Sequence, residues 1–204
     1  MEEMERNLLP TKAQSGRKIH TLHGLGGIGK TQLAIAYARK HLHTYSAIVW
    51  VNGNSTDTVL QSLAGFARRA GVSGVSDPTA NTAQQAPDMR AEADAVLRWL
   101  ALERNRRWLM IFDNVDRDIQ SAEEDAQAYS VTSFLPPADH GSILVTTRLP
   151  SMGEIGKSTE VARLRQDQAL ELLRNRSGLH PSSKGTVGPP SASERTRQIN
   201  GLQI

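Results

Sequence analysis

Residues 24–31 read GLGGIGKT, that is Gly24, Leu25, Gly26, Gly27, Ile28, Gly29, Lys30 and Thr31. Four of the first six residues are glycine, and a Lys-Thr pair leads directly into a helical stretch. Glycines clear side chains from a loop and allow positive φ angles, so several backbone N–H groups can converge on one ligand. The segment matches G-x-x-x-x-G-K-[ST] between a strand and a helix, which is the context that this phosphate-binding pattern requires.

The pattern assigns a role to each part of the loop. Backbone N–H groups of residues 24–31 and the positive end of the following helix are predicted to bind the phosphates of a nucleotide. Lys30 is predicted to reach the β- and γ-phosphates of ATP, and the Thr31 hydroxyl to ligate Mg²⁺.

The rest of the chain alternates apolar runs with helical periods. We predict an α/β fold, a three-layer P-loop sandwich with a mostly parallel sheet of about five strands and helices on both faces. The predicted strands are 19–23, 47–51, 108–112, 142–145 and 159–164. The predicted helices are 31–43, 56–70 with Ser55 as N-cap, 91–104 and 166–175. We divide the chain into an N-terminal segment (1–17), a nucleotide-binding domain (18–178) and a tail of low order (179–204).

Polar residues follow two of the apolar runs. Asp113 ends the run WLMIF, and ligands of open parallel sheets bind at the carboxyl ends of the strands. Asp113 is therefore predicted to hold Mg²⁺ beside Thr31. Asp116, three residues later, either orients a water molecule or caps a turn. Arg148 follows the strand SILV, where its guanidinium either senses a γ-phosphate or lies on the surface.

Composition excludes several classes of protein. Lys plus Arg number 24 against 21 for Asp plus Glu, and the clustered arginines at residues 104–107 and 68–69 end helices, so no nucleic-acid partner is expected. The chain has no cysteine, which excludes disulfides and thiolate metal sites. Neither a signal peptide nor a membrane span is recognisable, and a cytoplasmic location is expected. The histidines at 20, 23, 41 and 43 show no metal-ligand spacing.

Together these segments resemble the NB-ARC group of STAND-class P-loop ATPases, which are nucleotide switches in signal transduction and innate immunity. The segment LHGLGGIGKTQLAIAYARKHLHTYSAIVWVNGNS is similar to the fungal, tetratricopeptide-bearing branch. WLMIFDNVD resembles its Walker B segment and GSILVTTR its sensor-1 segment. The resemblance covers about residues 18–175. It implies that the SILV strand lies between the strands ending at the glycine loop and at Asp113, that ADP and ATP favour different conformations, and that Arg148 reads the γ-phosphate.

The sequence departs from that family at four places. Asn114 stands where many members have a second acid, so slow or absent hydrolysis is expected. The Gly-Arg-Glu-type segment is not recognisable in residues 1–17, and Gln203 follows Gly201-Leu202 where the family has Gly-Leu-Pro-Leu. The winged-helix histidine and the repeats are also missing. A truncated NB-ARC module is therefore expected.

Three functions remain open from the sequence. The first is an ADP/ATP-binding switch module that self-associates or belongs to a larger NB-ARC protein. The second is a P-loop kinase or an active ATPase, although the long loop 72–90 carries a single arginine, Arg90, where a kinase lid is usually rich in arginine. The third is a degenerate fragment or decoy without catalysis.

Overall fold

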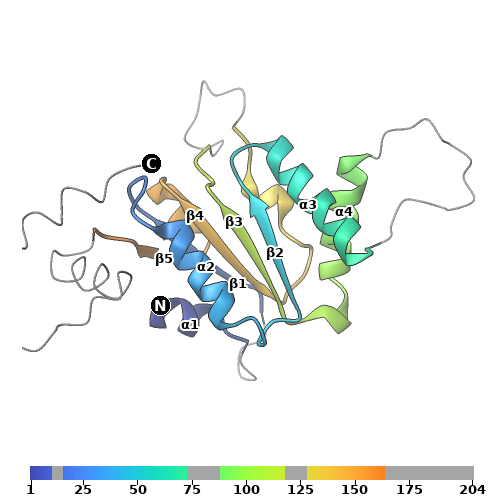
Figure 1. The fold of residues 1–204 in the computed structure, drawn as a ribbon, viewed down its shortest axis with the longest axis horizontal. Coiled ribbons are helices and arrows are strands. Elements are labelled where there is room, and N and C mark those ends of the chain that lie inside the picture. Colours follow the sequence, from blue (N-terminus) through green and yellow to red (C-terminus); the bar gives the residue numbers. More distant parts are fainter. Residues whose placement is uncertain (11–15, 73–87, 118–127, 164–204) are drawn as a thin grey trace, which may run out of the picture. The chain divides into compact units, whose positions relative to one another are not determined.

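The computed structural model describes residues 1–10, 16–72, 88–117 and 128–163, and its elements belong to one compact unit, Met1–Ala162. Five strands form one sheet in the order β2-β3-β4-β1-β5, and every neighbouring pair is parallel (Figure 1). The strands are β1 (Lys18–His23), β2 (Ala47–Asn52), β3 (Trp108–Asp113), β4 (Ser142–Thr147) and β5 (Lys157–Glu160). The α-helices are α1 (Glu2–Leu8), α2 (Lys30–Lys40), α3 (Thr56–Ala70) and α4 (Met89–Leu100). Short 3₁₀ helices are η1 (Glu103–Asn105), η2 (Val131–Phe134) and η3 (Pro150–Ile155).

Helices cover both faces of the sheet, which confirms the predicted three-layer α/β fold. On one face, α3 and α4 pack on side chains such as Val49, Met110 and Val145. On the other face, α1 and α2 pack on Leu109, Leu144 and neighbouring residues. Strand β3 alternates between the two cores, because successive side chains of a strand point to opposite faces. Apolar runs of this kind are what a sheet covered on both sides requires.

The predicted strand order is also confirmed. β4 lies between β1 and β3, with Ile143 opposite both Ile19 and Met110. This order brings the carboxyl ends of β1, β3 and β4 to one edge of the sheet, because all three strands are parallel. The glycine loop follows β1 at this edge, and Asp113 is the last residue of β3.

Two predicted helices and one strand differ most from the structure, and the bounds of the other four strands differ by one or two residues. The second helix ends at Lys40 rather than residue 43, and the helix predicted to reach residue 104 ends at Leu100, before η1. The fifth strand is Lys157–Glu160 rather than 159–164. It is a polar edge strand that pairs only with β1, so apolar content was a poor guide to its position. The predicted helix at 166–175 and the tail at 179–204 lie outside the described residues.

Helix α3 has the predicted bounds and the predicted N-cap. The Ser55 side chain accepts a hydrogen bond from the Thr58 N–H, and Thr58 Oγ1 accepts one from the Ser55 N–H, which is a capping box. Gly71 ends the helix in the left-handed conformation at φ 62°.

Helix α1 was not predicted, and it belongs to the core of this unit. Met4 and Leu8 are buried on the α2 face of the sheet. The Leu8 carbonyl accepts hydrogen bonds from Tyr45 Oη at 3.1 Å and Ser142 Oγ at 2.6 Å. Glu5 Oε1 lies 2.7 Å from the Lys40 ammonium at the end of α2. Of the helices in the described ranges, none combines the length and the apolar character needed to cross a membrane.

Candidate functional site

The glycine loop joins β1 to α2, and its glycines differ in what surrounds them. Gly24, Gly27 and Gly29 have φ angles of 144°, 72° and 104°, which side chains rarely adopt. A Cβ at Gly24 would lie 2.7 Å from the Val161 carbonyl oxygen, whereas one at Gly27 or Gly29 would meet nothing within 4 Å. The loop is therefore packed where it leaves the sheet and open where α2 begins.

Lys30 is the first residue of α2, and its side chain folds back over the loop. Its ammonium donates to the carbonyl oxygens of Gly24 and Leu25, both at 2.8 Å. Burial lowers the pKa of Lys30, and the nearby charges of Asp116 and Asp113 oppose that effect. Two backbone carbonyls thus hold a cation at the centre of the loop, where the sequence predicted a phosphate-binding lysine.

Thr31 and Asp113 meet at the carboxyl edge of the sheet, as the sequence analysis expected. The Thr31 hydroxyl donates to Asp113 Oδ1 at 2.8 Å, and the Thr146 hydroxyl donates to the same oxygen at 2.6 Å. Thr146 Oγ1 in turn accepts the backbone N–H of Asn114 at 2.9 Å. Two hydroxyls from two different elements therefore aim the Asp113 carboxylate toward the start of α2.

Asp116 and Arg148 form a second polar contact beside the loop. Asp116 Oδ2 lies 2.9 Å from Arg148 Nε, and Asp116 Oδ1 accepts the Arg148 backbone N–H at 2.7 Å. The Arg148 side chain is 62% exposed, and its Nε lies 3.5 Å from where a Cβ on Gly26 would stand. Asp116 therefore fixes both the backbone and the guanidinium of Arg148 next to the glycine loop.

The turn after β3 packs closely against the turn after β2, and the sequence did not predict the part that Val115 and Tyr129 have in this packing. Asn114 has φ 67°, a left-handed conformation that Asn tolerates better than most residues. The Tyr129 hydroxyl donates to the Gly53 carbonyl at 2.7 Å, and a Cβ at Gly53 would lie 2.5 Å from Val115 Cγ2. The sequence Asn52-Gly53-Asn54 indicated a turn after β2. The tight packing of that turn depends on Tyr129, which lies 76 positions after Gly53.

A separate cleft of about 840 Å³ opens at the amino end of β1, away from the glycine loop. Its lining includes the cationic residues Arg6, Arg17, Lys18 and Lys157. Lys18 and Arg17 already donate to the backbone carbonyls of Leu9 and Pro136, respectively. The sequence did not mark this cluster, because its members come from three distant segments.

Comparisons with known proteins agree with this architecture. The family model described as the NB-ARC domain matches residues 1–182. A nucleotide-binding leucine-rich repeat (NLR)-like protein of Hyaloscypha variabilis is 27% identical over 192 residues, which cover 89% of this chain and 18% of that protein. A probable disease resistance protein of Arabidopsis thaliana is 24% identical over 210 residues, which cover 100% of this chain and 27% of that protein.

Among solved structures, Cdc6p from Pyrobaculum aerophilum superimposes with a TM-score of 0.56 at 15% identity, covering 89% of this chain and 49% of that chain. At this identity the likeness concerns the fold alone. The present chain spans about a fifth to a quarter of the length of the two curated relatives. The family match extends over most of the chain and includes the glycine loop, Asp113 and Arg148. The chain therefore belongs to the NB-ARC family of STAND-class P-loop NTPases.

Proposed function

We propose that this chain is the ADP- and ATP-binding module of an NB-ARC signalling switch, with slow or absent ATP hydrolysis. The observation that carries the proposal is the 2.8 Å contact between Thr31 Oγ1 and Asp113 Oδ1. It joins the last residue of the phosphate-loop motif to the acid at the end of β3, as a shared Mg²⁺ site requires. A glycine-rich turn that matched the motif by chance would have no reason to face such an acid.

The loop fits a chain of phosphates in shape and in charge. Gly27 and Gly29 leave open space where side chains would otherwise stand, and the free N–H groups of α2 begin at the same point. Lys30 provides the cation, and among the described residues its ammonium donates to two carbonyls of its own loop. In the proposed complex, residues 24–31 bind the phosphates and the Lys30 ammonium exchanges those carbonyls for phosphate oxygens.

The donor set beside the loop also fits Mg²⁺. A hydroxyl and a carboxylate are hard oxygen ligands of the kind that Mg²⁺ prefers. Thr31 provides the hydroxyl and Asp113 the carboxylate, and the two groups lie within hydrogen-bonding distance of each other. Mg²⁺ bound with a nucleotide neutralises part of the phosphate charge. Thr146 keeps the Asp113 carboxylate oriented by donating to Oδ1, so the chain's own residues arrange the oxygens in advance.

Arg148 is proposed to distinguish ATP from ADP, with Asp116 as its positioning residue. Both Asp116 oxygens accept from Arg148, which supports a positioning role better than the activation of a water molecule. Asn114 is exposed and neutral, so it offers no second carboxylate to act as a general base. We therefore expect nucleotide retention with little turnover.

The place of the module in a larger protein is part of the same proposal. The two curated relatives are several times longer than the matched region, and one of them is described as a probable disease resistance protein. We propose that the module acts in the cytoplasm, within or beside a longer NB-ARC protein. Exchange of ADP for ATP would favour self-association by population shift, because the two nucleotides bind two conformations with different affinity.

The decisive experiment measures binding of ADP and ATP to the purified chain by calorimetry, with and without Mg²⁺. Lys30→Ala should weaken both affinities by about 10- to 100-fold, because a hydrogen bond to a charged group contributes about 1.5–3 kcal/mol. Thr31→Val should remove the Mg²⁺ dependence. Arg39→Ala, which deletes an exposed cation from the other end of α2, is the matched control and should bind like the wild type.

Each alternative function has its own outcome in this experiment. Absence of nucleotide binding by the wild type, or equal binding by Lys30→Ala, would overturn the proposal and favour a degenerate fragment or decoy. Turnover of ATP at about 1 per second or faster, a rate typical of kinases, would favour an active enzyme.

A further inference from the structure

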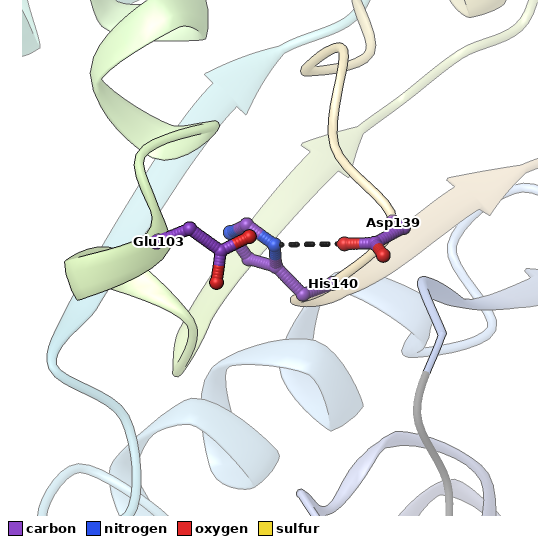
Figure 2. Close-up of side chains that lie close together, drawn as sticks. All are labelled: Glu103, Asp139 and His140. Carbon is purple, nitrogen blue, oxygen red and sulfur yellow. Dashed lines mark hydrogen bonds and ion pairs between the residues drawn. The ribbon is translucent and has the colours of Figure 1, made fainter.

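Three potential metal ligands meet at the amino edge of the sheet, opposite the glycine loop. Glu103 lies in η1, just before β3, and Asp139 and His140 immediately precede Gly141 and β4. One ligand atom from each of the three lies within 4.8 Å of the others. Figure 2 shows the His140 ring between the two carboxylates, which come from different segments of the chain. The cluster shares no residue with the nucleotide site.

His140 is buried, and its contacts define which ring nitrogen carries a proton. Its side chain is only 5% exposed, and Nε2 lies 3.1 Å from the Leu100 carbonyl oxygen. The same carbonyl accepts the Trp108 indole N–H at 2.8 Å. A carbonyl oxygen only accepts hydrogen bonds, so His140 Nε2 must donate to it. In a neutral imidazole the other nitrogen, Nδ1, then has a lone pair and no proton.

That lone pair points at an acceptor. Nδ1 lies 3.1 Å from Asp139 Oδ1, and the Glu103 carboxylate is the third member of the cluster (Figure 2). A neutral imidazole nitrogen and a carboxylate oxygen repel each other unless a positive species lies between them. The positive species is either a second proton on the ring or a metal ion bound to both atoms.

We propose that His140 Nδ1, Asp139 and Glu103 form a Zn²⁺ site. One imidazole with two carboxylates is a donor set that Zn²⁺ accepts, with a water molecule as fourth ligand. A metal-binding histidine usually donates its other N–H to a carbonyl or carboxylate, as His140 Nε2 does to Leu100. The edge-on Trp108 ring, 6.2 Å away, holds the imidazole in that orientation.

Zinc binding requires a movement of the exposed ligands. Atoms bound to one tetrahedral Zn²⁺ at about 2.0–2.2 Å lie roughly 3.3–3.6 Å apart, so two ligand atoms at the present limit of 4.8 Å must approach each other by about 1–1.5 Å. The side chains of Glu103 and Asp139 are 80% and 82% exposed, so both can make that movement freely. His140 provides the fixed ligand, and the two carboxylates close onto it.

Arg106 competes with the metal for Glu103. Its guanidinium Nη1 forms an ion pair with Glu103 Oε2, three residues earlier on the chain. Zinc binding replaces this pair, so removal of the Arg106 charge should tighten zinc binding. A purely structural ion pair between Asp139 and His140 would not give this response.

The test uses the full chain, freed of metals by a chelator, with no nucleotide present. Titration with Co²⁺ should produce the visible absorption of bound cobalt, and Zn²⁺ should abolish it at a stoichiometry of one. Asp139→Asn and Glu103→Gln should each weaken Zn²⁺ binding at least tenfold. Both side chains are exposed, so neither change should unfold the protein. Glu154→Gln, at another exposed acid, is the control and should bind zinc like the wild type.

Every outcome of this titration decides the proposal. Tighter zinc binding by Arg106→Gln, with losses in the two ligand variants, would support it. Unchanged zinc binding in Asp139→Asn and Glu103→Gln would place the metal on other residues, such as the exposed histidines, and overturn it. Absence of cobalt and zinc binding in the wild type would mean that the cluster is an imidazolium–carboxylate pair, and would also overturn it.

Discussion

Substitution of Gly24 by alanine should destabilise the fold far more than the same change elsewhere in the glycine loop. Its φ of 144° is unfavourable for any residue with a side chain, which costs about 1–3 kcal/mol. A Cβ would also stand 2.7 Å from the Val161 carbonyl oxygen, and such overpacking typically costs a further 1–3 kcal/mol. We therefore expect a loss of about 2–6 kcal/mol, a large part of the roughly 5–15 kcal/mol that stabilises a domain.

Two other glycines of the loop provide matched controls. Gly27 has φ 72° but open space around it, so Gly27→Ala should cost only about 1–2 kcal/mol. Gly26 lies outside the positive-φ group, and a Cβ there would make only ordinary contacts with Arg148, so Gly26→Ala should change stability by less than about 0.5 kcal/mol.

Urea unfolding without nucleotide, followed by tryptophan fluorescence, measures these differences. With a slope near about 2 kcal/mol/M, Gly24→Ala should lower the unfolding midpoint by about 1–3 M. A midpoint for Gly24→Ala equal to that of Gly27→Ala would refute the argument from the Val161 contact. Equal values for Gly26→Ala and Gly27→Ala would refute the argument from φ.

Three further predictions concern the ion pair, the buried histidine and the capping box. Asp116→Ala should leave Arg148 unpositioned and lower ATP affinity up to about fivefold without changing that of ADP, because a partly exposed ion pair contributes about 0.2–1 kcal/mol; a calorimetric change shared by both nucleotides would contradict this. Burial lowers the pKa of His20 in the folded protein, so the unfolded chain becomes protonated at a higher pH than the folded one. The stability that neutral His20 contributes is therefore present above about pH 6.5 and is lost as the pH falls. His20→Gln should therefore flatten the fall of the urea midpoint between about pH 7 and 5, and an unchanged slope would be the contrary result. Ser55→Ala should lower stability by about 1 kcal/mol in the same urea assay and leave nucleotide affinity unchanged, since the cap lies at the start of α3; a loss of affinity would count against that separation.

The sequence predicted β1, β2, β3 and β4 closely, but it misplaced the edge strand β5 and missed the helix α1. The runs WLMIF and SILV identified β3 and β4 because both strands are buried on two faces, where apolar content is a physical requirement. The polar strand β5 pairs on one side only, and α1 has few apolar residues, so neither carries a strong pattern. The positions of β5 and α1 depend on contacts with residues that are distant in the sequence, and the local pattern of apolar residues carries no information about such contacts.

The sequence predicted the residues of the candidate nucleotide site but not the hydrogen bonds that connect them. The motif indicated Lys30 and Thr31, and the ends of the apolar runs indicated Asp113 and Arg148. That Thr146 shares Asp113 Oδ1 with Thr31 depends on the register of β3 against β4. His140 was not singled out at all, because its partners lie 37 and 40 residues away in the sequence, at positions 103 and 100.

The Leu8 carbonyl has a practical consequence for expressing this module. A chain shortened to begin at the first strand would lack α1, and the hydroxyls of Tyr45 and Ser142 would lose a shared acceptor. The apolar surface under Met4 would meet water at the same time. A shortened chain of this kind should aggregate or bind hydrophobic dyes, so fusion tags belong ahead of Met1 and not at the start of the sheet.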